Sequence, residues 1–197
     1  MTRLVQRANE YRRRHGLLAL PRELCLRTYR RLFQNWHYVF ACDEPPALCT
    51  PPTGLRLLHC REPHGLPDAY REQIVRELSV AMNATLNHDF ANRAELFVAL
   101  DGDQVAAIQW VRFGCHVRSW FVPLRADDFV LFGGTTLPRF RRRGIMTWMI
   151  VDQTRYALQR GGRGHSDVKV WNTPAIRAVE CAGYRRIACL RPLRAEP

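Results

Sequence analysis

The chain has 197 residues, 47% of them hydrophobic, and a formal net charge of +12 at pH 7. This length suits one domain with a small appendage, and the apolar content is enough to form a core. No apolar run approaches the roughly 20 residues that span a bilayer, and no Cys or His spacing matches a zinc site. The Cys and His spacing therefore predicts no bound metal. Because no secretory leader pattern opens the chain, we expect a cytoplasmic protein.

The most basic part of the chain is residues 3–40, with nine arginines against two glutamates. Gly16 and Pro21 interrupt this stretch, which predicts two short helices. We therefore expect a basic helical extension over residues 1–42. Two interpretations of its surface stay open: residues 1–40 lie on the anionic inner face of a membrane, or the helices pack on the domain with a solvated basic back.

A proline-rich segment follows. Residues 43–53, with the sequence DEPPALCTPPT, hold four prolines, which neither a helix nor a central strand accepts. We expect a linker at 43–53 and place the main domain at 54–197.

The rest of the chain alternates between the periods of strands and helices. We expect strands at 55–60, 95–100, 104–114, 128–137, 167–171 and 184–190, and helices at 67–86, 144–160 and 172–183. The apolar stretch SWFVPL, residues 119–124, fits either an extended piece or a loop. The order from residue 55, β-α-β-β-β-α-β-α-β, predicts an α/β fold with a mixed central sheet flanked by helices.

The stretch PRFRRRGIMTWMI, residues 138–150, places four arginines in five positions directly before an apolar helix. A nucleic-acid patch and a pocket for a phosphorylated small molecule are the two competing explanations. The first amides of a helix lack internal acceptors, so their partial positive charge favours an anion, and Gly144 allows a ligand to approach the main chain. A pyrophosphate group fits this combination. Because no basic stripe with interleaved aromatics and no DNA-binding motif is present, we consider nucleic acid the weaker explanation.

The sequence TLPRFRRRGI resembles the coenzyme A loop of the GNAT acyltransferases, where Arg or Gln is followed by two residues, Gly, one residue, and Gly or Ala. Arg141 and Gly144 match this pattern, and Met146 departs from it at the last position. The order of elements around the loop strengthens the likeness, and NTPAIRAVECAGY, residues 172–184, is similar to the family's Asn-x-x-Ala…Gly-Phe segment. The resemblance covers residues 55–190.

The resemblance implies a GNAT-like fold that binds acetyl-CoA in a V-shaped cleft between the strands at 128–137 and 167–171. It implies that main-chain groups of Thr136 and Leu137 hold the pantetheine arm and that Asn172 lies near the thioester. The pyrophosphate would be held by the loop and the first helical turn, which consist of Arg141, Arg142, Arg143, Gly144, Ile145, Met146 and Thr147.

The implied activity is transfer of an acetyl group to a primary amine of a small molecule. This reaction requires a base for the amine and a group that stabilises or protonates the leaving thiolate. The position of the family's usual tyrosine acid is Val179 here, and Tyr184 belongs to the Gly-aromatic pair, where a side chain is usually part of the core. The remaining candidates for the base are Asp128 and His116, a carboxylate and an imidazole next to predicted strands.

Two alternatives stay open at this point. In the first, the donor is a fatty acyl chain on acyl carrier protein, an acidic partner that the arginines of residues 139–143 would attract. In the second, the chain is a non-catalytic GNAT-like binding module that docks on an anionic membrane. The acceptor carries no recognisable signal in the sequence.

Overall fold

The structure is a computed structural model that describes residue 25, residue 29 and residues 35–79 and 81–192. The chain divides into two compact units, Met1–Trp36 and His37–Pro197. The basic helices expected in residues 3–40, and the membrane-facing surface expected on residues 1–40, fall almost entirely outside the described residues.

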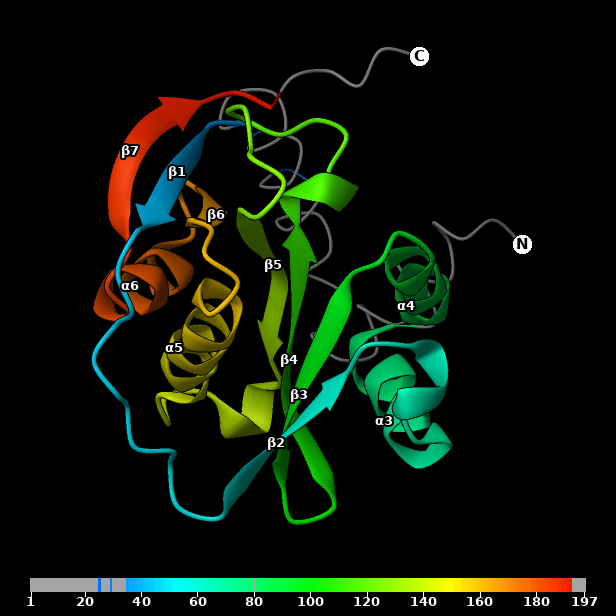
Figure 1. Ribbon diagram of the computed structural model, residues 1–197. Coiled ribbons are helices and arrows are strands. Elements are labelled where there is room, and N and C mark those ends of the chain that lie inside the picture. The colour runs from blue at the N-terminus through cyan, green and yellow to red at the C-terminus, as the bar shows by residue number, and fades with distance from the viewer. Residues whose placement is uncertain (1–24, 26–28, 30–34, 80, 193–197) are drawn as a thin grey trace. The chain divides into compact units, whose positions relative to one another are not determined.

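The second unit is built on a seven-stranded sheet with the strand order β2-β3-β4-β5-β6-β1-β7 (Figure 1). The strands are β1 (His37–Cys42), β2 (Leu55–Cys60), β3 (Glu95–Asp101), β4 (Gln104–Phe113), β5 (Phe129–Thr136), β6 (Gly164–Lys169) and β7 (Arg185–Leu190). Neighbouring strands are antiparallel except β5 and β6, which are parallel. The predicted mixed central sheet is therefore confirmed.

Helices cover both faces of this sheet, with α3 and α4 on one face and α5 and α6 on the other (Figure 1). Their bounds are Asp68–Leu78 for α3, Ala81–Ala91 for α4, Ile145–Leu158 for α5 and Thr173–Cys181 for α6. The single helix predicted over 67–86 is wrong, because the backbone is extended at Ser79 and ends α3 there. No helix in the described ranges has the length and apolar character needed to cross a bilayer.

The strand β1 corrects the predicted domain boundary. We expected residues 1–42 to be helical, but residues 37–42 form an inner strand that pairs with β6 on one side and β7 on the other. Val39 and Phe40 of this strand are completely buried. The proline-rich segment 43–53 consequently connects two strands of one sheet, and the second unit begins at residue 37 rather than 54.

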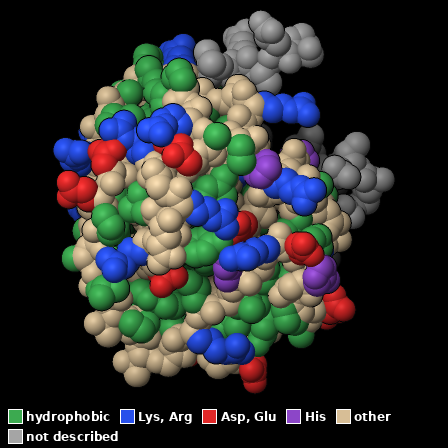
Figure 2. Space-filling view, viewed as in Figure 1, with side chains coloured by type: hydrophobic (Ala, Val, Ile, Leu, Met, Phe, Trp, Pro, Cys, Tyr) green, Lys and Arg blue, Asp and Glu red, His purple; other side chains and the backbone are tan. Residues whose placement is uncertain are grey.

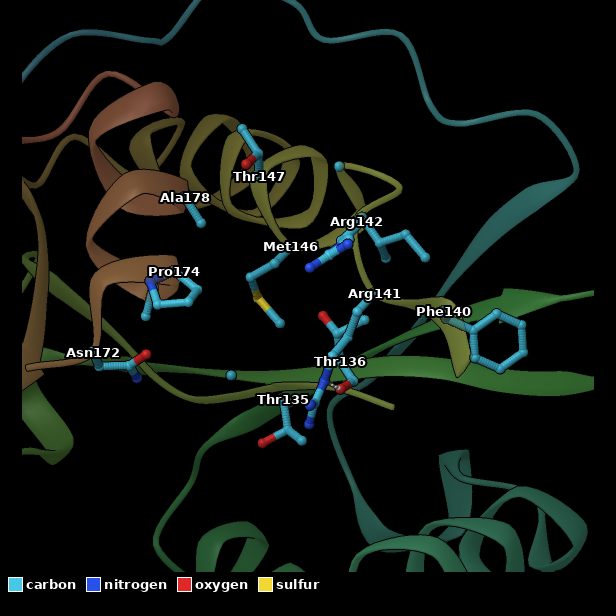
Figure 3. Close-up of a pocket in the computed structure, with 14 residues that line it drawn as sticks. Thr135, Thr136, Phe140, Arg141, Arg142, Met146, Thr147, Asn172, Pro174 and Ala178 are labelled. Carbon is cyan, nitrogen blue, oxygen red and sulfur yellow. Dashed lines mark hydrogen bonds between the residues drawn. The ribbon is translucent and has the colours of Figure 1, made fainter. Parts of the chain in front are cut away.

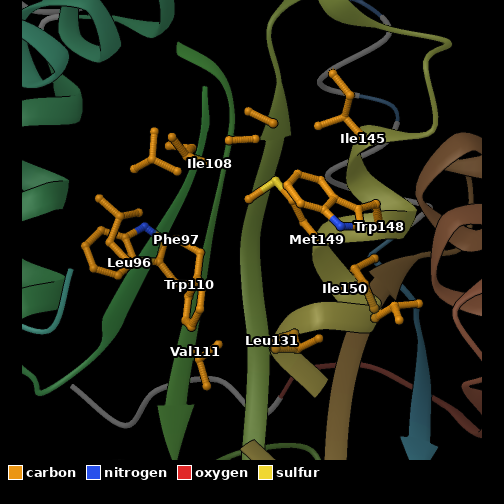
Figure 4. Close-up of a cluster of buried hydrophobic side chains, with 14 of the residues drawn as sticks. Leu96, Phe97, Ile108, Trp110, Val111, Leu131, Ile145, Trp148, Met149 and Ile150 are labelled. Atoms are coloured by element: carbon orange, nitrogen blue, oxygen red, sulfur yellow. The ribbon is translucent and has the colours of Figure 1, made fainter. Parts of the chain in front are cut away.

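The hydrophobic core lies on both faces of the sheet. On the face of α5, Met149 and Ile150 of that helix pack toward Leu131 of β5 (Figure 4). On the opposite face, the ring of Trp110 meets the ring of Phe90 of α4 edge to face, with centroids 4.9 Å apart. Because full burial of one large apolar side chain contributes about 1.5–3 kcal/mol, these contacts hold the helices against the sheet.

The parallel pair β5 and β6 separates along its length. The two strands pair only at Phe129↔Gly164, Val130↔His165 and Leu131↔Ser166, although β5 continues to Thr136. Pairing with β4 also shifts by one residue between Ile108 and Trp110, which marks a β-bulge in β5. A bulge bends its strand and increases the local twist, so it directs the end of β5 away from β6.

Glycine is required at the bulge. Gly133 has φ of +63°, and a Cβ there would lie 2.9 Å from Cδ1 of Trp110. Any other residue at this position would strain the backbone and collide with a buried ring.

Candidate functional site

A cavity of about 650 Å³ opens where β5 and β6 separate, between the end of β5, the start of α5 and the start of α6. Figure 3 shows Thr135 and Thr136 on one side of it, Met146 and Thr147 of α5 on another, and Asn172 and Pro174 at α6. We call this space the donor cavity, after the acyl donor that the sequence resemblance led us to expect here. Its lining residues are Gly134, Thr135, Thr136, Phe140, Arg141, Arg142, Gly144, Ile145, Met146, Thr147, Asn172, Pro174, Ala175 and Ala178.

A tight loop leads from β5 into α5 at the edge of the donor cavity. Pro138–Phe140 form one turn of 3-10 helix, and both Arg142 and Gly144 adopt positive φ, at +64° and +73°. A Cβ on Gly144 would meet no atom within 4 Å, so the space beside this residue is open. A left-handed arginine is uncommon and costs of order 1 kcal/mol, a kind of strain that is concentrated at functional loops.

The first turn of α5 presents main-chain donors to the donor cavity. The carbonyl of Gly144 accepts the first helical hydrogen bond, from the amide of Trp148 at 3.0 Å. The amides of Ile145, Met146 and Thr147 therefore have no carbonyl within the helix to which they could donate, and all three residues line the cavity. Helix N-termini of this kind favour anions.

The arginines of the loop do not all face the donor cavity. Arg141 lies along β5, and its Nε donates to the carbonyl of Thr136 at 3.2 Å (dashed in Figure 3). Arg142 also lines the cavity. Arg143 turns away, because its Nη1 lies 2.6 Å from Oδ2 of Asp101. The side chains of Arg141 and Arg142 therefore supply positive charge to the cavity, and that of Arg143 does not line it.

Leu137 lies outside the donor cavity. Its side chain is buried, and its amide donates to the carbonyl of Ala106 at 2.9 Å. Because that amide is already used, the main-chain contacts available to a ligand come from the preceding residues Gly134, Thr135 and Thr136. The sequence predicted a strand over 128–137, one residue longer at this end than β5, and could not show which amides bond to the neighbouring strand.

Asn172 lies at the opposite wall of the donor cavity. Its main chain begins α6, with the carbonyl accepting from the amide of Ile176 at 3.0 Å. Within the described part of the chain its side-chain amide forms no hydrogen bond, so it is available to a ligand. Pro174, Ala175 and Ala178 extend this wall with apolar surface that the sequence analysis did not identify.

Gly134 is a further lining residue that the sequence analysis did not identify. A Cβ at this position would lie 3.1 Å from Sδ of Met146 and 3.3 Å from Nε2 of the buried Gln109. A larger residue would have to displace these side chains, so glycine keeps this part of the cavity open. The only sequence signal was the pair Gly133-Gly134 inside an apolar strand, a pattern typical of a bulge or of close backbone approach.

The two residues expected to act as the base lie elsewhere. Asp128 is 4% exposed, and its carboxylate accepts the amides of Arg125 at 2.8 Å and Arg163 at 2.9 Å. It lines a different cavity of about 660 Å³ at the start of β5. His116 is exposed in a one-turn 3-10 helix, Gly114–His116, and lines neither cavity. The structure therefore brings neither residue into the donor cavity, and Asp128 ties two loops together instead.

Tyr184 belongs to the core, as its place in the Gly-aromatic pair indicated. It is 3% exposed, and its hydroxyl lies 2.8 Å from Oγ1 of Thr154 on α5. Burial raises the pKa of this phenol far above its ordinary value. Val179 is buried beside it in the core cluster. No group of three or more His, Cys, Asp or Glu side chains suited to a metal ion occurs among the described residues.

No protein-family profile and no curated protein sequence matches the chain, but solved structures do match it. An acetyltransferase of the GNAT family from Colwellia psychrerythraea superposes with a TM-score of 0.58 at 13% identity, covering 77% of this chain and 52% of that one. A GCN5-related N-acetyltransferase from Sphaerobacter thermophilus gives 0.55 at 16% identity, covering 84% and 53%. A GCN5-related N-acetyltransferase from Kribbella flavida gives 0.51 at 12% identity, covering 78% and 55%.

The chain thus has the GNAT fold, as its motifs and element order predicted. It spans about half the length of each of these solved structures. At this level of identity the likeness concerns the fold, so activity and substrates have to be argued from the residues of the chain itself.

Proposed function

We propose that this chain is an acyltransferase that moves an acetyl group from acetyl-CoA to a primary amine of a small molecule. The observation that supports this most directly is the position of the donor cavity, at the separation of β5 and β6 and against the first turn of α5. The GNAT fold of the chain agrees with this assignment, since the solved structures that share it carry acetyltransferase names.

The residues of the cavity fit such a donor. The free amides of Ile145, Met146 and Thr147 and the side chains of Arg141 and Arg142 would hold the pyrophosphate. The open space beside Gly144 would let the phosphates approach the main chain. When bound, acetyl-CoA supplies an acyl group activated as a thioester.

The arm of the donor has its own partners in the cavity. It would run along the part of β5 that has no partner in β6, at Gly134, Thr135 and Thr136, in the manner of an added strand. The free carboxamide of Asn172 faces it from the other wall. These contacts are made by main-chain groups and one amide, so they place no demand on the Met146 side chain.

A fatty acyl donor on acyl carrier protein is the second candidate. The observation that favours it is that Arg139, Arg141 and Arg142 are exposed at the loop beside the cavity, where an acidic carrier would be attracted. Figure 2 shows that basic side chains on the viewed face lie among acidic and apolar ones rather than in one uniform patch. Direct comparison of the two donors distinguishes the candidates.

The decisive experiment is calorimetry of the chain with acetyl-CoA, with longer acyl-CoAs and with acyl carrier protein carrying a fatty acyl chain. We expect acetyl-CoA to bind, and Gly144→Asp to abolish binding because it adds a carboxylate beside the pyrophosphate. Gly161→Asp is the matched control: Gly161 lies just beyond the other end of α5, has φ of +89° and also has no atom within 4 Å of its Cβ position.

Equal donor affinities in wild type and Gly144→Asp would contradict the loop assignment. Binding of the loaded carrier protein in the absence of any acyl-CoA binding would favour the second candidate. Loss of binding in both glycine variants would point to unfolding, which circular dichroism would detect directly.

A further inference from the structure

A histidine and an aspartate form a close pair across the neighbouring strands β1 and β6. Nδ1 of His37, the first residue of β1, lies 2.7 Å from Oδ2 of Asp167 on β6. Their side chains are 11% and 22% exposed, so the pair is largely shielded from water and still reachable. Neither the sequence motifs nor the comparisons point to these residues.

The pair lies on the face of the sheet opposite α5. Gly164 of β6 faces α5, because a Cβ there would lie 2.7 Å from the hydroxyl of Tyr184, which is bonded to Thr154 of that helix. Side chains alternate along a strand, so Asp167, three residues further, faces the other way. The ring of Phe121, from the loop between β4 and β5, is centred 5.2 Å from His37 on that face.

Asp167 also lies at the closed end of the strand separation. The last pair between β5 and β6 is Leu131↔Ser166, and Asp167 is the first residue of β6 beyond it. The first turn of α5, which would hold the pyrophosphate under the proposed function, lies at the open end, beyond Thr136. If the chain is an acyltransferase as proposed above, a donor arm that follows β5 from α5 brings its reactive end toward Asp167 and His37.

The hydrogen-bond pattern of the imidazole suits proton transfer. A proton on Nδ1 is donated to the Asp167 carboxylate, which leaves the lone pair of Nε2 as the acceptor. Within the described part of the chain Nε2 has no hydrogen-bond partner. An imidazole held in one tautomer by a carboxylate is a common arrangement for a general base.

We propose that His37 takes the proton from the acceptor, a primary amine that arrives on the sheet face opposite α5, and that Asp167 is its positioning residue. Nε2 removes one proton from the ammonium group, and the nitrogen lone pair forms a C–N bond to the acyl carbon while the C–S bond breaks. The sulfur leaves with the second proton given up by nitrogen, and His37 returns its proton to solvent. The amine is a cation before it reacts, so the Asp167 charge also favours its approach.

The first test compares wild type with His37→Gln and Asp167→Asn. His64→Gln is the matched control, because the His64 side chain is 83% exposed and contacts Glu62 on the surface. Thiol release from acetyl-CoA is followed over pH 5–9 with a panel of primary amines, and donor affinity is measured by calorimetry. We expect His37→Gln to lower kcat about 100-fold or more with unchanged donor affinity. Asp167→Asn should lower kcat about 10-fold and change the acid limb of the pH profile, and His64→Gln should change nothing.

The second test needs no turnover. Diethyl pyrocarbonate modifies accessible imidazoles, and peptide mass spectrometry measures its rate at His37 and His64 in the wild-type protein. We expect saturating acetyl-CoA to slow the modification of His37 several-fold and to leave His64 unchanged. This measurement decides the matter even if His37→Gln fails to fold.

The outcomes separate this inference from the proposed function. Acetyl transfer by His37→Gln within about threefold of wild type, or an unprotected His37 in a protein that binds acetyl-CoA, overturns the role of His37 and leaves the acyltransferase proposal standing. A wild-type protein that binds no acyl donor overturns both.

Discussion

In the loop between β5 and α5, residues 137–144, which we call the donor loop, the guanidinium group of Arg143 is held away from the donor cavity by Asp101 at the end of β3, with 2.6 Å between Nη1 and Oδ2. Arg142, its neighbour, lines the donor cavity. Two adjacent arginines therefore have different surroundings: Arg143 pairs with Asp101 at the β3–β4 turn, and Arg142 lines the donor cavity.

This difference predicts unequal losses of donor affinity. We expect Arg142→Ala to weaken acetyl-CoA binding about 10-fold, since a charged hydrogen bond contributes about 1.5–3 kcal/mol. Arg143→Ala should weaken it less than about fivefold, because a partly exposed ion pair contributes at most about 1 kcal/mol. Calorimetry on the two variants checks this, and equal losses would contradict the separate roles.

Glu95 predicts a pH dependence of stability. Burial tends to raise the pKa of this carboxyl, but hydrogen bonds from His59 at 2.7 Å and Tyr156 at 2.8 Å outweigh it, and the pKa lies below its ordinary value. A lowered pKa stabilises the fold above the unfolded pKa of about 4.3, and this contribution is lost as pH falls through the folded value.

We therefore expect Glu95→Gln to lower the free energy of unfolding by about 1–3 kcal/mol at pH 7. The difference from wild type should begin to shrink as the pH falls below the unfolded pKa of about 4.3, and it should disappear below the lowered pKa of the folded carboxyl. Urea titrations at several pH values measure both quantities. A difference that stays constant with pH would show that the Glu95 charge has no part in it.

Substitution of Asp128 is expected to lower the free energy of unfolding and to leave kcat nearly unchanged. Asp128→Ala leaves the amides of Arg125 and Arg163 without their acceptor in a buried place. We expect each unpaired amide to lower the free energy of unfolding by up to about 3 kcal/mol. At a temperature where the variant is folded, kcat should stay within about threefold of wild type. A folded variant with kcat reduced 100-fold would restore Asp128 as a candidate base.

Substitution of Tyr184 is likewise expected to lower the stability of the fold without changing the activity. Tyr184→Phe removes the hydroxyl that lies beside Thr154 in the core, so thermal unfolding should show a loss of about 0.5–1.5 kcal/mol. Because burial raises the pKa of the phenol, we expect no role for it as the acid and an unchanged pH profile of activity. A loss of activity at full stability would argue against this.

Several residues that line the donor cavity could be predicted from the sequence. The loop at residues 141–147 and the helix start at Asn172 are local features, because a short motif and its flanking periodicity define where the chain turns. The structure places Gly144, Met146 and Asn172 around one cavity, as the resemblance implied.

The other side of the sheet could not be predicted in this way. His37 and Asp167 are 130 residues apart, and they meet only because β1 pairs with β6. The six residues of β1 follow an arginine-rich stretch with helical spacing, so no local pattern marked them as an inner strand. The face on which a strand side chain lies depends on register, which a single sequence rarely fixes.

Because β1 lies between β6 and β7, the last strand of the domain depends on the first for its place in the sheet. In the described sheet β7 is bonded to β1 alone, so a shortened protein that started at residue 54 would lose its final strand together with its first. The edge of β6 would then be bare, and unsatisfied strand edges recruit other chains. Truncation at the proline-rich segment should therefore yield an aggregating product, even though the donor loop itself would remain intact in the sequence.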